Sequence, residues 1–230
     1  MKRIALVLLL VLGFASVSTA ATLDIYAAYV SRYMWRGCDS NFGQPSLQPG
    51  ITWYIGNTGI NLGLWGSYNL GNINPQDLNE IDYTLTYNGS YGSAVSYSLA
   101  YSYYYYPDQH APKTAELIGN LTLNEVIFTP NLLVAYDGDN GKGTYTSLGA
   151  KNNFSAGALA LNASLVAGYD MGQYGLPAGW SDINLAVSTA VNAGPVSITP
   201  SLNYVIINPD LMKNPLPNEG WIGVTASGSI

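Results

Sequence analysis

The chain has 230 residues, of which 48% are hydrophobic and only 10% are charged, and its formal net charge is −6 at neutral pH. Soluble domains normally devote about a quarter of their residues to charge, so something other than water is expected to cover much of the surface. Eight basic residues against fourteen acidic ones argue against nucleic acid as a partner, because such binding needs Lys and Arg to neutralise phosphates. The single cysteine, Cys38, cannot form an internal disulfide and is interpreted as an incidental loop thiol.

Residues 1–20 have the order of features that defines a secretory signal peptide. Lys2 and Arg3 precede an apolar run at 4–14, and small residues follow up to Ala20. The run is too short for a membrane-spanning helix, and cleavage is predicted after Ala20. The released chain, residues 21–230, then forms one domain, and its formal charge is −8 because two basic residues leave with the signal.

Hydrophobic and polar residues alternate along the mature chain, which predicts strands with one apolar and one polar face. In the first segment Leu23 and Ile25 share one face, whereas Asp24 and Arg32 share the other. Each predicted strand is near the 9–11 residues that a tilted membrane strand requires. The pattern predicts about twelve strands, near 23–36, 46–55, 60–69, 80–87, 95–105, 114–123, 127–137, 144–154, 157–169, 181–190, 195–207 and 221–230.

The connections between these strands alternate in length. Long ones follow odd-numbered strands, at 37–45, 71–79, 107–113, 137–143, 170–180 and 208–220. Short ones follow even-numbered strands, at 56–59, 88–92, 124–126, 153–156 and 191–194. Short periplasmic turns and long extracellular loops are typical of outer-membrane barrels, and closure removes the strand edges that hydrocarbon does not tolerate. The predicted fold is therefore all-β, an antiparallel transmembrane β-barrel in a Gram-negative outer membrane.

A soluble β-sandwich or a lipocalin-like barrel would also alternate. This alternative is disfavoured because the chain has too few charged residues to coat a surface in water. Aromatic residues support the membrane barrel, because they cluster near both ends of the predicted strands. The preference of aromatic residues for strands does not by itself predict such clustering. The apolar parity places one set near the long-loop end: Tyr33, Trp35, Tyr68, Tyr83, Tyr103, Tyr105, Tyr136, Tyr169 and Tyr204. A second set lies near the short turns: Trp53, Tyr87, Phe128 and Phe154. Together they predict two aromatic girdles against lipid.

Charged residues on the polar parity predict a ring inside the outer mouth. Strand directions bring together Arg32, Arg36, Glu80, Asp82, Glu116, Asp137 and Asp182. Asp24 and Lys151 are expected near the opposite end. Five acids against two arginines predict a weak preference for cations, because low-dielectric walls focus the potential of an acidic ring.

Four segments carry a resemblance to a known family. They are residues 29–37 (Tyr-Val-Ser-Arg-Tyr-Met-Trp-Arg-Gly), 44–48 (Gln-Pro-Ser-Leu-Gln), 80–83 (Glu-Ile-Asp-Tyr) and 104–107 (Tyr-Tyr-Tyr-Pro). With them the chain resembles the TorF-type porins, bacterial proteins of largely unestablished function. The resemblance spans the mature chain and implies an outer-membrane barrel without catalytic residues. The carboxyl end departs from the usual pattern, because outer-membrane strands commonly finish on an aromatic residue and this chain ends on Ile230.

Three features are candidates for a catalytic or metal-binding role. His110, the one histidine, lies in a loop between prolines and is interpreted as solvated rather than catalytic. Glu80 and Asp82 could act as an acid/base pair on a sugar, but an ion-pair network with Arg32 and Arg36 is favoured. Segment 137–143 is similar to an acidic calcium loop, but its composition is better explained by a flexible turn. No catalytic residue, metal or cofactor is predicted, and weak cation binding at 137–143 stays open.

The leading functional hypothesis is passive diffusion of a small hydrophilic solute through a narrow, weakly cation-preferring channel. A barrel of about twelve strands lies between small filled barrels and wide porins. The alternatives are a non-conducting structural or adhesive barrel with a plugged lumen and, behind it, an outer-membrane hydrolase. The expected partners are the lipid bilayer, lipopolysaccharide and a small polar solute. The identity of the solute and the oligomeric state are left open.

Overall fold

The computed structural model describes residues 21–71, 80–107, 112–157, 159–212 and 218–230. The predicted signal peptide and His110 lie outside the described residues. Within the described part of the chain, no helix is long and apolar enough to cross a membrane.

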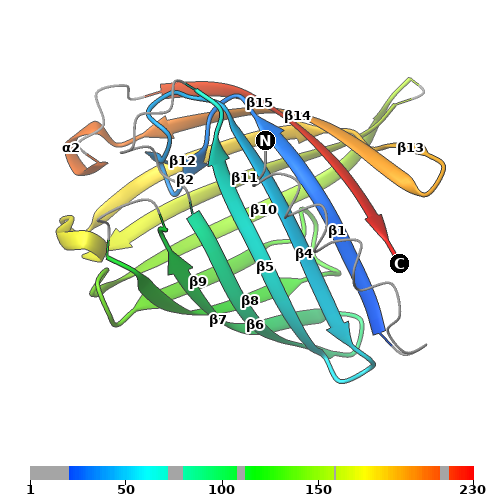
Figure 1. The fold of residues 1–230 in the computed structure, drawn as a ribbon, viewed down its shortest axis with the longest axis horizontal. Helices are drawn as coiled ribbons and strands as arrows, with labels where there is room; N and C mark the ends of the chain where they lie inside the picture. The colour runs from blue at the N-terminus through cyan, green and yellow to red at the C-terminus, as the bar shows by residue number, and fades with distance from the viewer. Residues whose placement is uncertain (1–20, 72–79, 108–111, 158, 213–217) are drawn as a thin grey trace.

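A single antiparallel sheet closes on itself to form a barrel (Figure 1). Its strands are β1 (Ala21–Val30), β4 (Ser46–Ile55), β5 (Ile60–Asn69), β6 (Glu80–Tyr91), β7 (Val95–Tyr105), β8 (Thr114–Leu123), β9 (Asn131–Asp137), β10 (Gly143–Ala156), β11 (Leu159–Met171), β12 (Gly179–Ser188), β14 (Val196–Ile207) and β15 (Asn218–Ser229). Each strand pairs with its neighbour in the chain, and β1 pairs with both β4 and β15. The short β13 (Val191–Ala193) pairs with β14 beyond the end of β12. The described residues thus form the predicted twelve-stranded wall.

Alternating side chains give this wall two different faces. Leu62, Leu85 and Leu165 lie on the outer face with 40%, 50% and 44% of their surface exposed. Tyrosines pair across strands on the same face, with ring centroids 6.4 Å apart for Tyr83 and Tyr103. Such aromatic cross-strand pairs stabilise a sheet. The wall is therefore apolar outside, where lipid lies against an outer-membrane barrel, and polar inside.

The first predicted strand is wrong at its upper end. It was expected to run to residue 36, but β1 ends at Val30 and is followed by the hairpin of β2 (Met34–Trp35) and β3 (Cys38–Asp39). Arg36 and Gly37 form the two-residue turn of this hairpin, with φ of 47° and 80°. Positive φ at both positions is what a tight hairpin turn requires. The alternation of polar and apolar residues continues through the hairpin, and alternation alone therefore predicts one longer strand.

Two further boundaries differ from the prediction. β9 begins at Asn131 rather than at 127, so Phe128 lies in the preceding turn with φ of 65° and 53% exposure. β6 extends to Tyr91, which shortens the following turn to residues 92–94. The other strands begin and end close to the predicted positions.

The connecting segments gather at one end of the barrel. Figure 1 shows the β2–β3 hairpin, the 3-10 helix η1 (Gln173–Gly175) and α2 (Pro209–Met212) at this end. Leu211 of α2 is buried close to Gly179. A Cβ atom added at Gly179 would lie 2.9 Å from Cδ1 of Leu211. Longer connections thus cover one mouth, which we call the outer mouth, whereas short turns border the other.

Candidate functional site

Residues 31–45, here called loop 31–45, turn inward and fill part of the outer mouth. At the tip of the hairpin, Gly37 lies against Asp182 of β12, three strands from β1 around the barrel. A Cβ atom at Gly37 would lie 2.9 Å from the Cβ of Asp182, and its φ of 80° is also unfavourable for other residues. Glycine at this position therefore permits both the tight turn and the close approach to β12.

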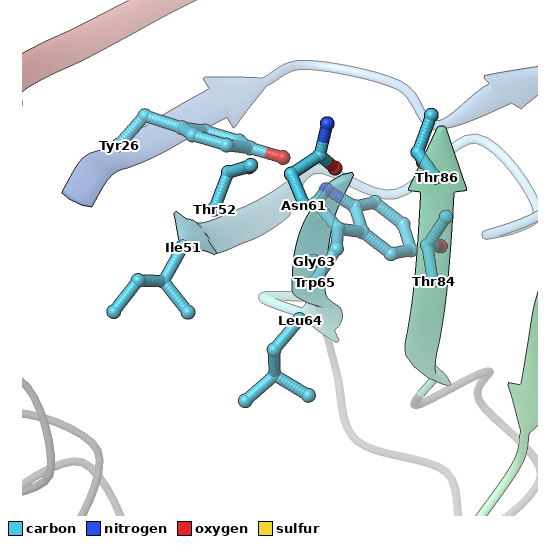
Figure 2. Close-up of a pocket in the computed structure, with 9 residues that line it drawn as sticks. All are labelled: Tyr26, Ile51, Thr52, Asn61, Gly63, Leu64, Trp65, Thr84 and Thr86. Atoms are coloured by element: carbon cyan, nitrogen blue, oxygen red, sulfur yellow. The ribbon is translucent and has the colours of Figure 1, made fainter. Parts of the chain in front are cut away.

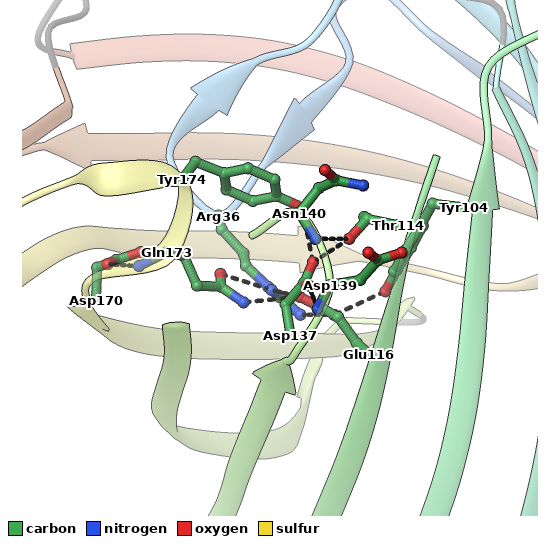
Figure 3. Close-up of polar contacts among 10 residues, drawn as sticks. All are labelled: Arg36, Tyr104, Thr114, Glu116, Asp137, Asp139, Asn140, Asp170, Gln173 and Tyr174. Atoms are coloured by element: carbon green, nitrogen blue, oxygen red, sulfur yellow. Dashed lines mark hydrogen bonds and ion pairs between the residues drawn. The ribbon is translucent and has the colours of Figure 1, made fainter. Parts of the chain in front are cut away.

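An ion pair joins the tip of this loop to the barrel wall. The Arg36 guanidinium donates two hydrogen bonds to the Glu116 carboxylate of β8, at 2.6 and 2.8 Å (Figure 3). Gln173 and Tyr104 donate further hydrogen bonds to the same carboxylate, each at 2.8 Å. The Glu116 side chain is completely buried and that of Arg36 is 13% exposed. This bidentate geometry is strong and directional, so it fixes the position of the loop tip.

Aromatic rings enclose the Arg36 guanidinium from two sides. Its Cζ atom lies 4.4 Å from the ring centroid of Trp35 and 4.6 Å from that of Tyr145. Trp35 also makes edge contacts with Tyr104 and Tyr174, with centroids 6.4 and 6.3 Å apart. Cation–π contacts of this kind strengthen as the cation is desolvated.

These contacts contradict two of the predicted girdle positions. Tyr33 and Trp35 were expected to face lipid, but Tyr33 is buried inside and Trp35 packs on Arg36. The reason is the hairpin turn, which carries both rings into the lumen with the loop. The other predicted girdle residues are largely exposed on the outer face: Tyr68, Tyr83, Tyr105, Tyr136, Tyr169 and Tyr204 near the outer mouth, and Trp53, Tyr87, Phe128 and Phe154 near the turns. Tyr103 is half-buried, beside the Lys113 ammonium.

Arg32 secures the base of the same loop. Its guanidinium pairs with Asp39 at 2.8 Å and with Glu219 of β15 at 2.6 Å. Asn41 donates a hydrogen bond of 2.8 Å to Ser46, whose hydroxyl also contacts that of Ser67. Loop 31–45 is thus attached to β15 through Arg32 and to β4 through Asn41.

The remaining acids of the predicted ring are engaged by polar neighbours. Thr114 donates a hydrogen bond of 2.6 Å to Asp137. Ser181, Tyr145 and Asn184 donate hydrogen bonds to Asp182. Asp137 also accepts a bond from the backbone N–H of Asp139, within the segment that was compared with a calcium loop. Each of these carboxylates is fully buried.

An ion-pair network of Glu80 and Asp82 with the two arginines was predicted, but the described residues do not form it. In the described residues the arginines pair with Glu116, Asp39 and Glu219, because the hairpin carries Arg36 across the lumen. Tyr33 of loop 31–45 instead donates a 2.9 Å hydrogen bond to Glu80. The Oδ1 atom of Asp82 is buried without a hydrogen-bond partner in the described chain. Burial, followed by the charges of Glu80 and Asp82, raises the pKa of the Tyr33 hydroxyl well above its usual value.

Sequence reasoning missed several members of this site. Asp39, Glu219, Asp170 and Gln173 take part in it although they were not assigned to it. The carboxylate of Asp170 accepts hydrogen bonds from the backbone of Gly172 and Gln173, which shapes η1 and directs Gln173 inward. The Arg36-Gly37 pair could have indicated the role of Asp39. A two-residue turn at these positions folds β3 back onto β2, which returns Asp39 to the side of Met34.

The lumen below this network is lined differently. A cavity of about 190 Å³ lies against β1, β4, β5 and β6 (Figure 2). The side chains that border it are polar or aromatic: Tyr26, Thr52, Asn61, Trp65, Thr84 and Thr86. Figure 2 shows Ile51 and Leu64 pointing to the opposite side of the wall. The inner half therefore offers open space next to uncharged hydrogen-bonding groups.

The closed antiparallel wall, its apolar exterior and its loop-filled mouth define an outer-membrane β-barrel. The chain belongs to a family described as a bacterial protein of unknown function (Gcw_chp), whose profile matches residues 15–213. No protein of curated function is similar in sequence at a significant level.

Solved structures share the fold. The NanC porin aligns with a TM-score of 0.54 and 11% identity over 90% of this chain and 98% of its own. LpxR from Salmonella typhimurium aligns with a TM-score of 0.55 and 12% identity over 90% of this chain and 99% of its own. At such low identity the likeness concerns the barrel architecture alone.

Proposed function

We propose that the protein is a narrow outer-membrane channel for passive diffusion of small hydrophilic solutes, with loop 31–45 as its constriction. The observation that carries this proposal is the contrast within the lumen. A cavity of about 190 Å³ in the inner half is bordered by hydroxyl, amide and aromatic groups, whereas one loop fills the outer mouth through polar contacts. The porin fold of NanC and the resemblance to TorF-type porins support the same function.

The constriction depends on contacts that can be broken without damaging the wall. Loop 31–45 is held by ion pairs and hydrogen bonds from Arg32, Tyr33, Arg36 and Asn41. Substitution of these residues can release the loop, because none of them belongs to a strand of the barrel wall. Transport is favoured over catalysis because the mouth carboxylates are engaged by structural partners. His110, on which the hydrolase alternative depends, lies outside the described residues.

A weak cation preference is part of this proposal. The acids around the mouth are Asp39, Glu80, Asp82, Glu116, Asp137, Asp170, Asp182 and Glu219. Arg32 pairs with Asp39 and Glu219, and Arg36 pairs with Glu116. Excess negative charge at a narrow point favours cations. The strong burial of these acids limits the effect until the loop moves.

Planar bilayer recordings test the function directly. Purified, folded protein should give discrete current steps of one reproducible size, and liposomes that contain it should swell in isotonic solutions of a small sugar. Reproducible absence of both signals, with folding verified by heat-modifiable migration, would contradict the channel.

A second function is favoured by one specific observation. Glu116, Asp137 and Asp182 have no exposed surface at all, so the mouth is closed around them. A non-conducting barrel with a structural or adhesive role would need just such a plug. The same recordings separate the two functions, because a permanent plug gives no steps even when loop 31–45 is released by mutation.

A further inference from the structure

The cavity in the inner half of the lumen combines two kinds of recognition group. Trp65 offers an indole ring and Tyr26 offers a phenol ring (Figure 2). The Tyr26 ring lies across Gly50. A Cβ atom at Gly50 would lie only 2.2 Å from Cζ of Tyr26, so the glycine makes room for this ring. Aromatic side chains bind apolar faces while their polar atoms remain free for hydrogen bonds.

Hydrogen-bonding groups surround the two rings. Thr52, Asn61, Thr84 and Thr86 line the same cavity. In the described chain, Thr84 contacts the hydroxyl of Ser102 at 3.0 Å. A hydroxyl group can donate one hydrogen bond and accept two, and an amide can do both. The cavity can therefore satisfy several hydroxyl groups of a solute at once.

Charge is absent from the residues that border this cavity, although Asp82 lies beside it. Asp82 is the register partner of Trp65, and its buried Oδ1 atom has no hydrogen-bond partner in the described chain. The unpaired carboxyl oxygen can accept a hydrogen bond from a hydroxyl donor, and no cationic side chain of the described residues borders the cavity to compensate the charge of an anion. The site thus suits a neutral molecule that carries both hydroxyl groups and an apolar face.

We propose that this cavity is a binding subsite for a neutral sugar of monosaccharide size, with Trp65 and Tyr26 against its carbon face and the threonines and Asn61 on its hydroxyls. The proposal rests on the channel function, of which it names the solute class. A volume of about 190 Å³ accommodates one such ring.

Indole N–H signals in an NMR spectrum of micellar protein test the subsite without requiring conductance. Glucose should shift the Trp65 signal along a saturable curve, whereas glucuronate, which differs in carrying a carboxylate, should bind at least tenfold more weakly. The Trp53 signal, from the outer face, serves as the internal control. No movement of Trp65 with glucose, or equal affinity for both probes, would overturn the proposal.

Two variants assign any shift to the cavity. Gly63→Val fills the space, and its Cβ would meet Thr84 at 3.6 Å, an ordinary contact, so folding is preserved. Thr86→Val removes one hydroxyl and keeps the shape. Glucose affinity should fall at least tenfold in Gly63→Val and severalfold in Thr86→Val, and unchanged affinity in both would refute the site. Binding by a barrel that does not conduct would refute the channel instead and leave the site standing.

Discussion

The outer and inner halves of the lumen use polar residues in opposite ways. In the outer half, charged groups are buried and joined across the barrel, as in the Arg36–Glu116 pair. In the inner half, uncharged groups such as Asn61 and Thr86 border open space. A buried carboxylate is costly unless a partner compensates its charge. The comparison shows that the strands supply most of the acids, whereas loop 31–45 supplies both arginines, which pair with Glu116, Asp39 and Glu219.

The largest effect should come from removing the cation of the outer half. Arg36→Ala leaves Glu116 buried without its partner and should lower the free energy of unfolding by about 3–5 kcal/mol. Urea titration of the micellar protein measures the change. The double variant Arg36→Met/Glu116→Gln is the matched control, since it removes both charges and should be less destabilised. Equal losses in the two variants would show that the pair does not hold the loop.

The wall should respond to charge on one face only. Leu85→Arg places a cation on the lipid-facing surface near mid-strand and should cost about 2–4 kcal/mol of unfolding free energy in bilayers. Thr86→Arg, one residue further along and facing the cavity, should cost clearly less. If the two substitutions destabilise the barrel equally, the assignment of the faces of β6 is wrong.

The same contrast explains how much could be predicted from the sequence. Strand alternation shows which residues of a strand face outward, so the twelve-stranded wall was predicted, although three strand ends differ by four to six residues. The outer mouth depends instead on contacts between segments far apart in the chain, such as Arg36 with Glu116 and Gln173. Strand direction placed Arg36 and Glu116 at the same end of the barrel, and alternation placed both inside. Neither could show that a turn at Gly37 carries Arg36 across the lumen.

Cys38 reports on the closure of the outer half. Burial, followed by the charges of Asp182 and Asp170, raises the pKa of its thiol from 9.0 to about 11. Only the thiolate reacts with maleimides, so at neutral pH the reaction should be about a hundredfold slower than for an ordinary thiol. The rate should rise about tenfold per pH unit until it levels off near the raised pKa. Rapid labelling at neutral pH would contradict the buried position of loop 31–45.

The smallest expected effect concerns ion preference. The triple variant Glu80→Gln, Asp82→Asn and Glu116→Gln should move the reversal potential under a salt gradient toward anions, and the shift should fade at high salt. Asp24→Asn is the control, because Asp24 lies at the opposite end of the lumen, bonded to Ser229. A reversal potential that responds equally to both changes would remove the outer mouth as the selective region.

The most direct test of the account compares single-channel conductance of the wild type with that of Arg36→Ser/Glu116→Gln in planar bilayers. Both proteins should give discrete steps, and the variant should show larger or longer openings because the tip of loop 31–45 is no longer held by the ion pair. Absence of steps in both folded proteins, or identical steps in the two, would contradict a channel that loop 31–45 constricts.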